Sequence, residues 1–179
     1  MKIVEELLPY NNSLPLRSSE SLRAVVLHCT ELPTLAMARK YGEKIIYDDR
    51  TGNSGHYYID RDGSVYRYVE DNRVARHVRG KNVDSIGIEL VNTGRYPHWY
   101  SAQSQNPTEP YSAEQIESLK NLLRELKMKH PQLLELARHS DLDTETLPAD
   151  DNPAAQIRRK IDPGPLFPWE DIRQFWGTI

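Results

Sequence analysis

The chain has 179 residues, of which 38% are hydrophobic and 27% charged, as is typical of one globular domain with a full core. Its 23 lysines and arginines stand against 26 acidic residues, and the net charge of −3 excludes the basic footprint of a nucleic-acid-binding protein. The single cysteine, Cys29, excludes an intramolecular disulfide framework.

The N-terminus lacks the apolar region of a signal peptide, and no stretch approaches the ~18 apolar residues of a membrane span. We therefore expect a cytoplasmic protein with no membrane and no nucleic acid among its partners. A phage-type protein, released or exported by a non-signal route, fits the same sequence. Because no exposed apolar stripe is evident, we expect a monomer.

The first elements along the chain are a strand and a helix. A β-branched, apolar run at 23–30 predicts a buried central strand that carries His28 near its carboxyl end. Residues 33–47 predict a helix, with Pro33 suited to its first turn. The following segment, 48–55, is rich in Asp, Gly and Asn and predicts a loop.

Three further strands follow. Segments 56–60 and 65–69 flank an Asp-Gly dipeptide, which predicts a hairpin. Segment 85–91 predicts a strand that directs Ile88 to one face and Glu89 to the other. The apolar residues around Glu89 argue against a solvent-facing edge strand, and a buried carboxylate needs a partner.

The second half of the chain begins with a long loop at 93–111. Ser112 and Gln115 fit a capping box, which predicts the start of an amphipathic helix that ends near Pro131. A short strand at 133–140 carries His139. The acidic segment 141–151 predicts a loop, and 169–176 predicts a last helix.

No internal repeat or linker divides this order of elements. We predict an α/β fold in which a mixed central β-sheet is flanked by helices. One domain is expected over 1–179, with its core at about 22–176.

Two histidines and one carboxylate are the ligand set of an open zinc site, and His28, His139 and Asp162 supply it. Three protein ligands leave a fourth position for water, as in hydrolytic zinc enzymes. If the chain is extended at Asp162, Lys160 points the same way, because side chains alternate with period two. Cys29 points to the face opposite His28 and is interpreted as a small buried apolar residue.

Five motifs follow one another in order: His28-Cys29-Thr30, the hairpin at 54–63, the strand at 85–90, the segment 138–141, and the Lys-Ile-Asp-Pro-Gly-Pro run at 160–165. Together they resemble the zinc N-acetylmuramoyl-L-alanine amidases of the type-2 amidase family. That family is related to T7-type lysozyme and to peptidoglycan recognition proteins. The resemblance extends from about residue 22 to 170.

The resemblance implies that His28, His139 and Asp162 bind Zn²⁺. Zinc lowers the pKa of a bound water to roughly 7 and so generates a nucleophile at neutral pH. Lys160 would stabilise the developing oxyanion, and Glu89 would hold or deprotonate the attacking water. By the same resemblance, the scissile bond is the amide between the lactyl group of N-acetylmuramic acid and L-alanine of the stem peptide.

Each assignment has a structural alternative. His28 could be a hydrogen-bonded core histidine, and Asp162 a helix cap or turn residue before Pro163. Lys160 could be a solvated member of a basic run. Glu89 could be a carboxylate on an edge strand that faces solvent.

Substrate contacts are predicted for His77, Arg79, Asn82 and Trp99. The Arg side chain matches carboxylates, and the Trp offers a surface for sugar stacking. A solvated basic loop and a loop's own packing are equally good interpretations. His77 could line the substrate groove or only fix the sheet, whereas we interpret His56 as structural.

We predict an amidase that acts on soluble, anhydro-muropeptide-like fragments in wall recycling, because no export signal is evident. The alternatives are a lytic amidase acting on intact wall and a non-catalytic peptidoglycan-recognition module. A zinc peptidase has no support, since the chain lacks a His-Glu-x-x-His motif. The segment 142–159 is longer than in related recycling amidases, and we interpret it as a lid or groove wall.

Overall fold

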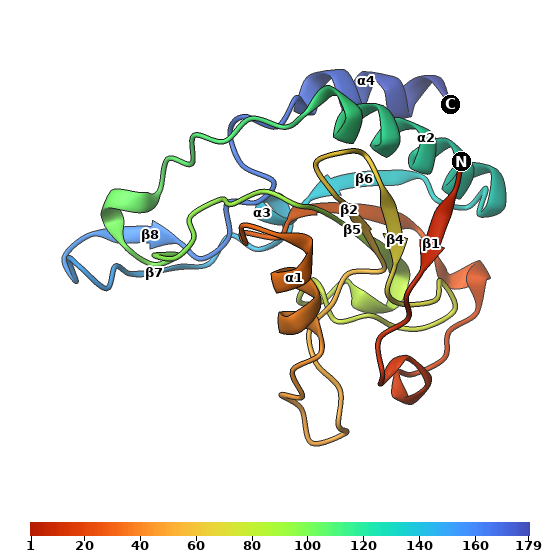
Figure 1. The fold of residues 1–179 in the computed structure, drawn as a ribbon, viewed down its shortest axis with the longest axis horizontal. Coiled ribbons are helices and arrows are strands. Elements are labelled where there is room, and N and C mark those ends of the chain that lie inside the picture. The colour runs from red at the N-terminus through yellow and green to blue at the C-terminus, as the bar shows by residue number, and fades with distance from the viewer.

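The computed structural model describes all 179 residues, and a six-stranded sheet organises them (Figure 1). The strand order is β1-β4-β3-β5-β2-β6. The bounds are β1 Ile3–Glu5, β2 Ala24–Cys29, β3 Tyr57–Ile59, β4 Val65–Arg67, β5 Ser85–Leu90 and β6 Glu135–Arg138. Only the β3–β4 pair is antiparallel. The mixed sheet with flanking helices confirms the predicted fold class.

Strands β2 and β5 form the centre of the sheet. Every residue of β2 is buried, as expected for an apolar strand that pairs in parallel on both sides. In β5, Ile86, Ile88 and Leu90 join the larger hydrophobic core. Gly87 and Glu89 alternate with them and lie on the opposite face, as the sequence predicts.

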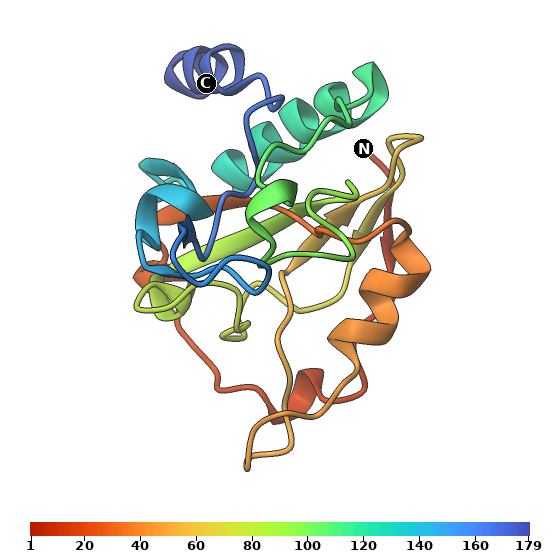
Figure 2. The ribbon, with the colours of Figure 1, turned by 90° about the vertical axis from the view of Figure 1, so that its left-hand side faces the viewer.

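Two helices cover the core face of the sheet. They are α2 (Ala113–Lys129) and α4 (Trp169–Thr178), which lie together on one side in Figures 1 and 2. The predicted capping box of α2 is present, because Ser112 and Gln115 each accept a hydrogen bond from the other's backbone N–H. Buried leucines of α2 and Ile172 and Trp176 of α4 complete the core. The opposite face carries a second hydrophobic cluster, which includes Tyr58 of β3 and Ala38 of α1, and beside it the polar side chain of Glu89.

The helix predicted at 33–47 is shorter than expected. It is α1 (Leu35–Gly42), which begins after the N-cap Thr34. Beyond Gly42 the backbone N–H groups of Ile46 and Tyr47 donate to the carbonyl of Thr51 instead of continuing the helix. The segment therefore forms a projecting loop, visible below α1 in Figure 1.

The predicted strand at 133–140 and loop at 141–151 also need correction. Strand β6 ends at Arg138, and His139 opens a one-turn helix, α3 (His139–Leu142). The segment that follows is not only loop, because β7 (Thr146–Pro148) pairs with β8 (Gln156–Arg158) in an antiparallel hairpin. These strands have only three residues each, too few to show a period-two pattern.

Short elements complete the chain. Strand β1 at the N-terminus has no signal in the sequence, and it extends the sheet by pairing in parallel with β4. None of the helices combines the length and apolar character that crossing a bilayer requires. Four 3₁₀ helices lie in the connections, at η1 Asn11–Ser13, η2 Ser19–Ser21, η3 Asn82–Asp84 and η4 Ala102–Ser104.

Candidate metal centre

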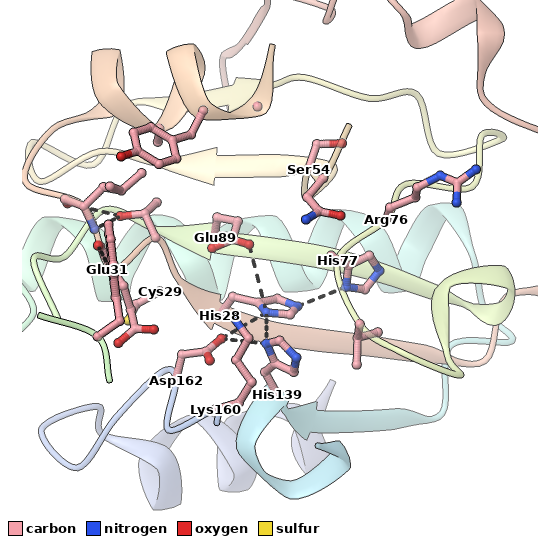
Figure 3. A pocket seen from close by; sticks show the side chains of 18 of the residues that line it. His28, Cys29, Glu31, Ser54, Arg76, His77, Glu89, His139, Lys160 and Asp162 are labelled. Atoms are coloured by element: carbon pink, nitrogen blue, oxygen red, sulfur yellow. Dashed lines mark hydrogen bonds and ion pairs between the residues drawn. The ribbon is translucent and has the colours of Figure 1, made fainter. Parts of the chain in front are cut away.

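Three segments far apart in sequence bring His28, His139 and Asp162 together (Figure 3). His28 is near the end of β2, and His139 directly follows β6. Because these strands are parallel neighbours, their carboxyl ends meet at one edge of the sheet. Asp162 arrives from the chain after β8, where its carbonyl accepts a hydrogen bond from the backbone N–H of Ser140.

The three side chains present one atom each to a common point. His28 Nδ1 lies 2.9 Å from His139 Nδ1 and 3.1 Å from Asp162 Oδ2, and the last two atoms are 2.9 Å apart. Ligands of a tetrahedral zinc ion at about 2.05 Å lie roughly 3.3 Å from each other, so the arrangement fits such an ion after small movements. All three residues are buried, and Asp162 Oδ1 and His139 Nε2 have no hydrogen-bond partner.

The electrostatics of the cluster favour the ligating protonation states. Burial, followed by the neighbouring His139, lowers the pKa of His28 to about 4. Burial alone raises the pKa of Asp162, but the charge and hydrogen bond of His139 outweigh it and hold that pKa well below its ordinary value. At neutral pH the centre therefore offers an uncharged His28 imidazole and an ionised carboxylate, the forms that bind metals.

Glu89 lies beside this centre on the same face of the sheet. Its Oε1 is 4.0 Å from His28 Nδ1, and its side chain is 15% exposed. Burial, and then the charge of Asp162, raise the pKa of Glu89 well above its ordinary value. Gly55 makes room for this side chain, because a Cβ there would lie 2.8 Å from Glu89 Cγ.

Lys160 lines the same cavity as the cluster and forms no ion pair, whereas the adjacent Arg159 pairs with Asp143 and Glu145. Figure 3 shows Lys160 beside Asp162. The structure thus brings Glu89 and Lys160, the two predicted catalytic residues, to the three predicted ligands. The centre combines a potential metal site, a carboxylate that can hold a proton, and an unpaired cation.

A cavity of about 530 Å³ opens over the centre. The four predicted substrate contacts, His77, Arg79, Asn82 and Trp99, all line it. His77 Nδ1, however, lies 3.0 Å from His28 Nε2, so this side chain is engaged with a predicted ligand.

The other three predicted contacts are also engaged within the protein. Asn82 Oδ1 accepts hydrogen bonds from the backbone N–H groups of His77 and Val78, and so shapes its own loop. The indole N–H of Trp99 donates to the Glu31 carbonyl at 3.0 Å. Arg79 is exposed and pairs with Glu145 at 2.6 Å.

Sequence reasoning missed several residues of the cavity. The projecting loop after α1 contributes Lys44, Ile46 and Tyr47. The segment 142–159 contributes Arg159. This segment contacts the loop 93–111, which carries Trp99, because Asp151 accepts a hydrogen bond from Ser101 at 2.6 Å. No periodic pattern marks these positions. Arg159 is the part of the segment 142–159 that lines the cavity, and a lid or groove-wall role of this segment stays a prediction.

Two residues near the centre are outside the ligand cluster. Cys29 is buried, and it is absent from the group that could hold a metal. His56 is fully buried, and its Nδ1 accepts the backbone N–H of Gly87 at 3.0 Å. The position of His56 agrees with a structural role.

Comparisons with known proteins agree with this geometry. The family model described as N-acetylmuramoyl-L-alanine amidase matches residues 18–165. The endolysin of Klebsiella phage KP32 is 32% identical over 84 residues, which are 47% of this chain and 51% of that protein. The N-acetylmuramoyl-L-alanine amidase AmiD of Escherichia coli (strain K12) is 34% identical over 119 residues, which are 62% of this chain and 37% of that protein.

Among solved structures, the N-acetylmuramoyl-L-alanine amidase LysC from Clostridium intestinale URNW superposes with a TM-score of 0.69 at 26% identity. That match covers 97% of this chain and 96% of the other. The curated matches are partial, since this chain covers about half of the phage endolysin. The family model nevertheless matches most of the chain and confirms the resemblance: this protein belongs to the N-acetylmuramoyl-L-alanine amidase family.

Proposed function

We propose that residues 1–179 form one zinc-dependent N-acetylmuramoyl-L-alanine amidase domain. The reaction is hydrolysis of the amide between the lactyl group of N-acetylmuramic acid and L-alanine of a peptidoglycan stem peptide. The observation that carries this proposal is the buried convergence of His28, His139 and Asp162 next to Glu89 and Lys160. A pure recognition module would have no use for the complete set.

Zinc is the metal that this donor set favours, because it accepts imidazole nitrogen and carboxylate oxygen in a four-coordinate site with one open position. His28 and His139 would hold it through Nδ1, and Asp162 through Oδ2. When bound, zinc supplies Lewis acidity and lowers the pKa of water at the open position to about 7.

Glu89 is proposed as the proton carrier. Its carboxylate faces the centre from β5, where it would accept a proton from the attacking water. The same oxygen would then deliver that proton to the leaving nitrogen of L-alanine. A raised pKa suits both steps, because it keeps the protonated form accessible near neutral pH.

Lys160 is proposed to stabilise the transition state. As water adds to the amide carbon, negative charge grows on the carbonyl oxygen, and a fixed ammonium group nearby stabilises it. Because no carboxylate is paired with Lys160, its charge is available to the substrate. Arg159, by contrast, is neutralised by Asp143 and Glu145.

The finer substrate is proposed to be a soluble muropeptide released in wall turnover. A cavity of about 530 Å³ is of the size that takes one small molecule, in agreement with a sugar that carries a short peptide. AmiD, 34% identical over 119 residues, is named as an amidase of this bond. A monomer acting in the cytoplasm stays a prediction from the sequence.

The test is mass spectrometry of products after incubation with purified anhydro-muropeptides and, separately, with intact sacculi. We expect stem peptide with a free L-alanine amino terminus from the soluble substrate. A chelator should abolish its release and added zinc should restore it. Faster release from sacculi would assign a lytic role instead. Stoichiometric zinc binding without cleavage of either substrate would overturn the amidase proposal.

A further inference from the structure

A chain of hydrogen bonds extends from His28 away from the metal centre. His28 Nε2 lies 3.0 Å from His77 Nδ1, and His77 Nε2 lies 3.2 Å from Ser85 Oγ. Ser85 Oγ in turn lies 2.6 Å from the carbonyl oxygen of Lys81. The chain of hydrogen bonds ends at a backbone carbonyl oxygen, which can accept a hydrogen bond but cannot donate one.

That end fixes the direction of every bond in the chain. The Lys81 carbonyl can only accept, so the single hydroxyl proton of Ser85 is donated to it. Ser85 Oγ must then accept from His77, which places the one N–H of an uncharged His77 on Nε2. His77 Nδ1 is left as an acceptor, and His28 must donate to it from Nε2.

This direction leaves His28 with a free lone pair on Nδ1, the atom that faces His139 and Asp162. An imidazole must present an unprotonated nitrogen to a metal, so this is the tautomer that can ligate. The two histidines differ in the hydrogen bonding of the ring nitrogen that points away from the centre. His139 Nε2 is buried and has no hydrogen-bond partner at all.

Several contacts hold the His77 ring in its place. A Cβ at position 87 would lie 2.6 Å from His77 Cγ, so Gly87 provides the space that the ring occupies. The backbone N–H of His77 donates to Asn82 Oδ1 at 2.9 Å. The rings of His28 and His77 meet edge to face, with an interplanar angle of 85°.

We propose that His77 is a positioning residue for the metal centre, which holds His28 in the Nε2–H tautomer and in the orientation that directs Nδ1 to the metal. The proposal rests on the proposed zinc site, and it assigns His77 a role other than the substrate contact expected from the sequence. Ser85 and the Lys81 carbonyl determine which ring nitrogen of His77 carries the proton. Outer partners of this kind typically change metal affinity by about 10–100-fold when removed.

The first test measures zinc affinity by competition with a chromophoric chelator. We expect His77→Leu to bind zinc about 10–100-fold more weakly than the wild type. His77→Asn should recover most of the affinity, because its Oδ1 branches from Cγ as Nδ1 does and can accept from His28. The matched control is His98→Leu, the same change at an exposed histidine, which should leave the affinity unchanged.

The second test reads the tautomers directly, from ¹⁵N shifts of the histidine rings in the zinc-loaded wild type. We expect the proton on Nε2 in both His28 and His77, and an intermediate zinc affinity for Ser85→Ala. A proton on Nδ1 of His77, or equal zinc affinity in His77→Leu and wild type, would overturn this inference. A wild type that binds no zinc would instead overturn the proposed function, and the ring shifts of that protein would still test the tautomers.

Discussion

Glu89 and His28 are partners in the register of the parallel strands β5 and β2, and Glu89 Oε1 lies 4.0 Å from His28 Nδ1. Both side chains project from the face of the sheet that α2 and α4 leave free. The backbone ladder of two central strands therefore fixes the carboxylate relative to the metal centre. Sites built on strands in this way are held more rigidly than sites built on loops.

Replacement of Glu89 by Gln should separate catalysis from metal binding. Gln has nearly the same shape but accepts no proton at neutral pH, so we expect kcat to fall by about 10²–10⁴-fold. Zinc content should stay at one per chain, because Glu89 is outside the ligand cluster. Product release and metal analysis of the same sample measure both. Glu20→Gln, at an exposed position, is the control, and full activity in Glu89→Gln would refute the assigned role.

For Lys160, the charge itself is the quantity to test. Lys160→Met removes the charge and keeps most of the unbranched side chain, so we expect kcat to fall by about 10²–10³-fold with little change in zinc affinity. Lys160→Arg should retain more activity than Lys160→Met. If Lys160 were only a solvated member of a basic run, Lys160→Met would behave like Lys2→Met, a change at an exposed lysine. Steady-state kinetics on one muropeptide decides between the two.

Zinc binding should be visible in the stability of the protein as well as in its activity. A ligand at 100 times its Kd stabilises the folded state by about 2.7 kcal/mol, which for a chain of this size raises Tm by roughly 5–10 °C. We expect that shift in the wild type and its absence in Asp162→Ala, which loses one of three ligands. Thermal unfolding with zinc and with chelator measures it. An equal shift in both proteins would place the metal elsewhere.

The parts of the fold that were predicted correctly have strong local signals. The apolar run of β2 and the Ser112–Gln115 capping box act within a few residues, and both are present. The grouping of His28, His139 and Asp162 was expected from the resemblance to the amidase family, and their residue types agree with a zinc ligand set.

The parts that were missed depend on contacts between distant residues. Strands β1, β7 and β8 have three residues each and exist through pairing, not through their own pattern. The contact of His28 with His77 joins positions 49 residues apart, and no spacing rule anticipates it. Roles that depend on such contacts therefore have to come from the three-dimensional arrangement.

Asp71 should make stability depend on pH. It is buried and accepts hydrogen bonds from Tyr57 at 2.5 Å, Lys129 at 2.7 Å and His130 at 2.9 Å. Burial alone raises the pKa of Asp71, but these hydrogen bonds outweigh it and hold the pKa well below its ordinary value. A lowered folded-state pKa gives stability that is present above the unfolded value of about 3.9 and lost as pH falls through the folded value.

Asp71→Asn should accordingly lower the unfolding free energy by about 1–3 kcal/mol at pH 7. It removes the negative charge that the hydrogen bonds from Tyr57, Lys129 and His130 stabilise. The difference from the wild type should shrink as pH falls below about 4, where the wild-type advantage disappears. Urea unfolding at pH 7, 5 and 3 tests this, with the exposed Asp48→Asn as control. A difference that stays constant over this range would show that ionisation of Asp71 contributes nothing.

The last prediction concerns the buried ion pair between Arg95 and Glu31, which links the segment 142–159 to the central sheet. Arg95 is 1% exposed in its side chain and binds Glu31 through two contacts, of 2.6 and 2.9 Å. The same guanidinium donates to the carbonyl oxygens of Arg158 and Arg159 at 3.0 Å. It therefore connects the turn after β2 to the chain that leads into Lys160.

Arg95→Met should lower the unfolding free energy by about 3–5 kcal/mol, because it leaves the Glu31 carboxylate buried without its charged partner. Amide hydrogens of 156–159 should also exchange faster, while those of β2 keep their protection. The double variant Glu31→Gln/Arg95→Met should lose less stability than the two single losses added together, since no buried charge is left. If the stability losses of the two single variants simply add, Arg95 and Glu31 are not coupled, and the segment 156–159 is held by its other contacts.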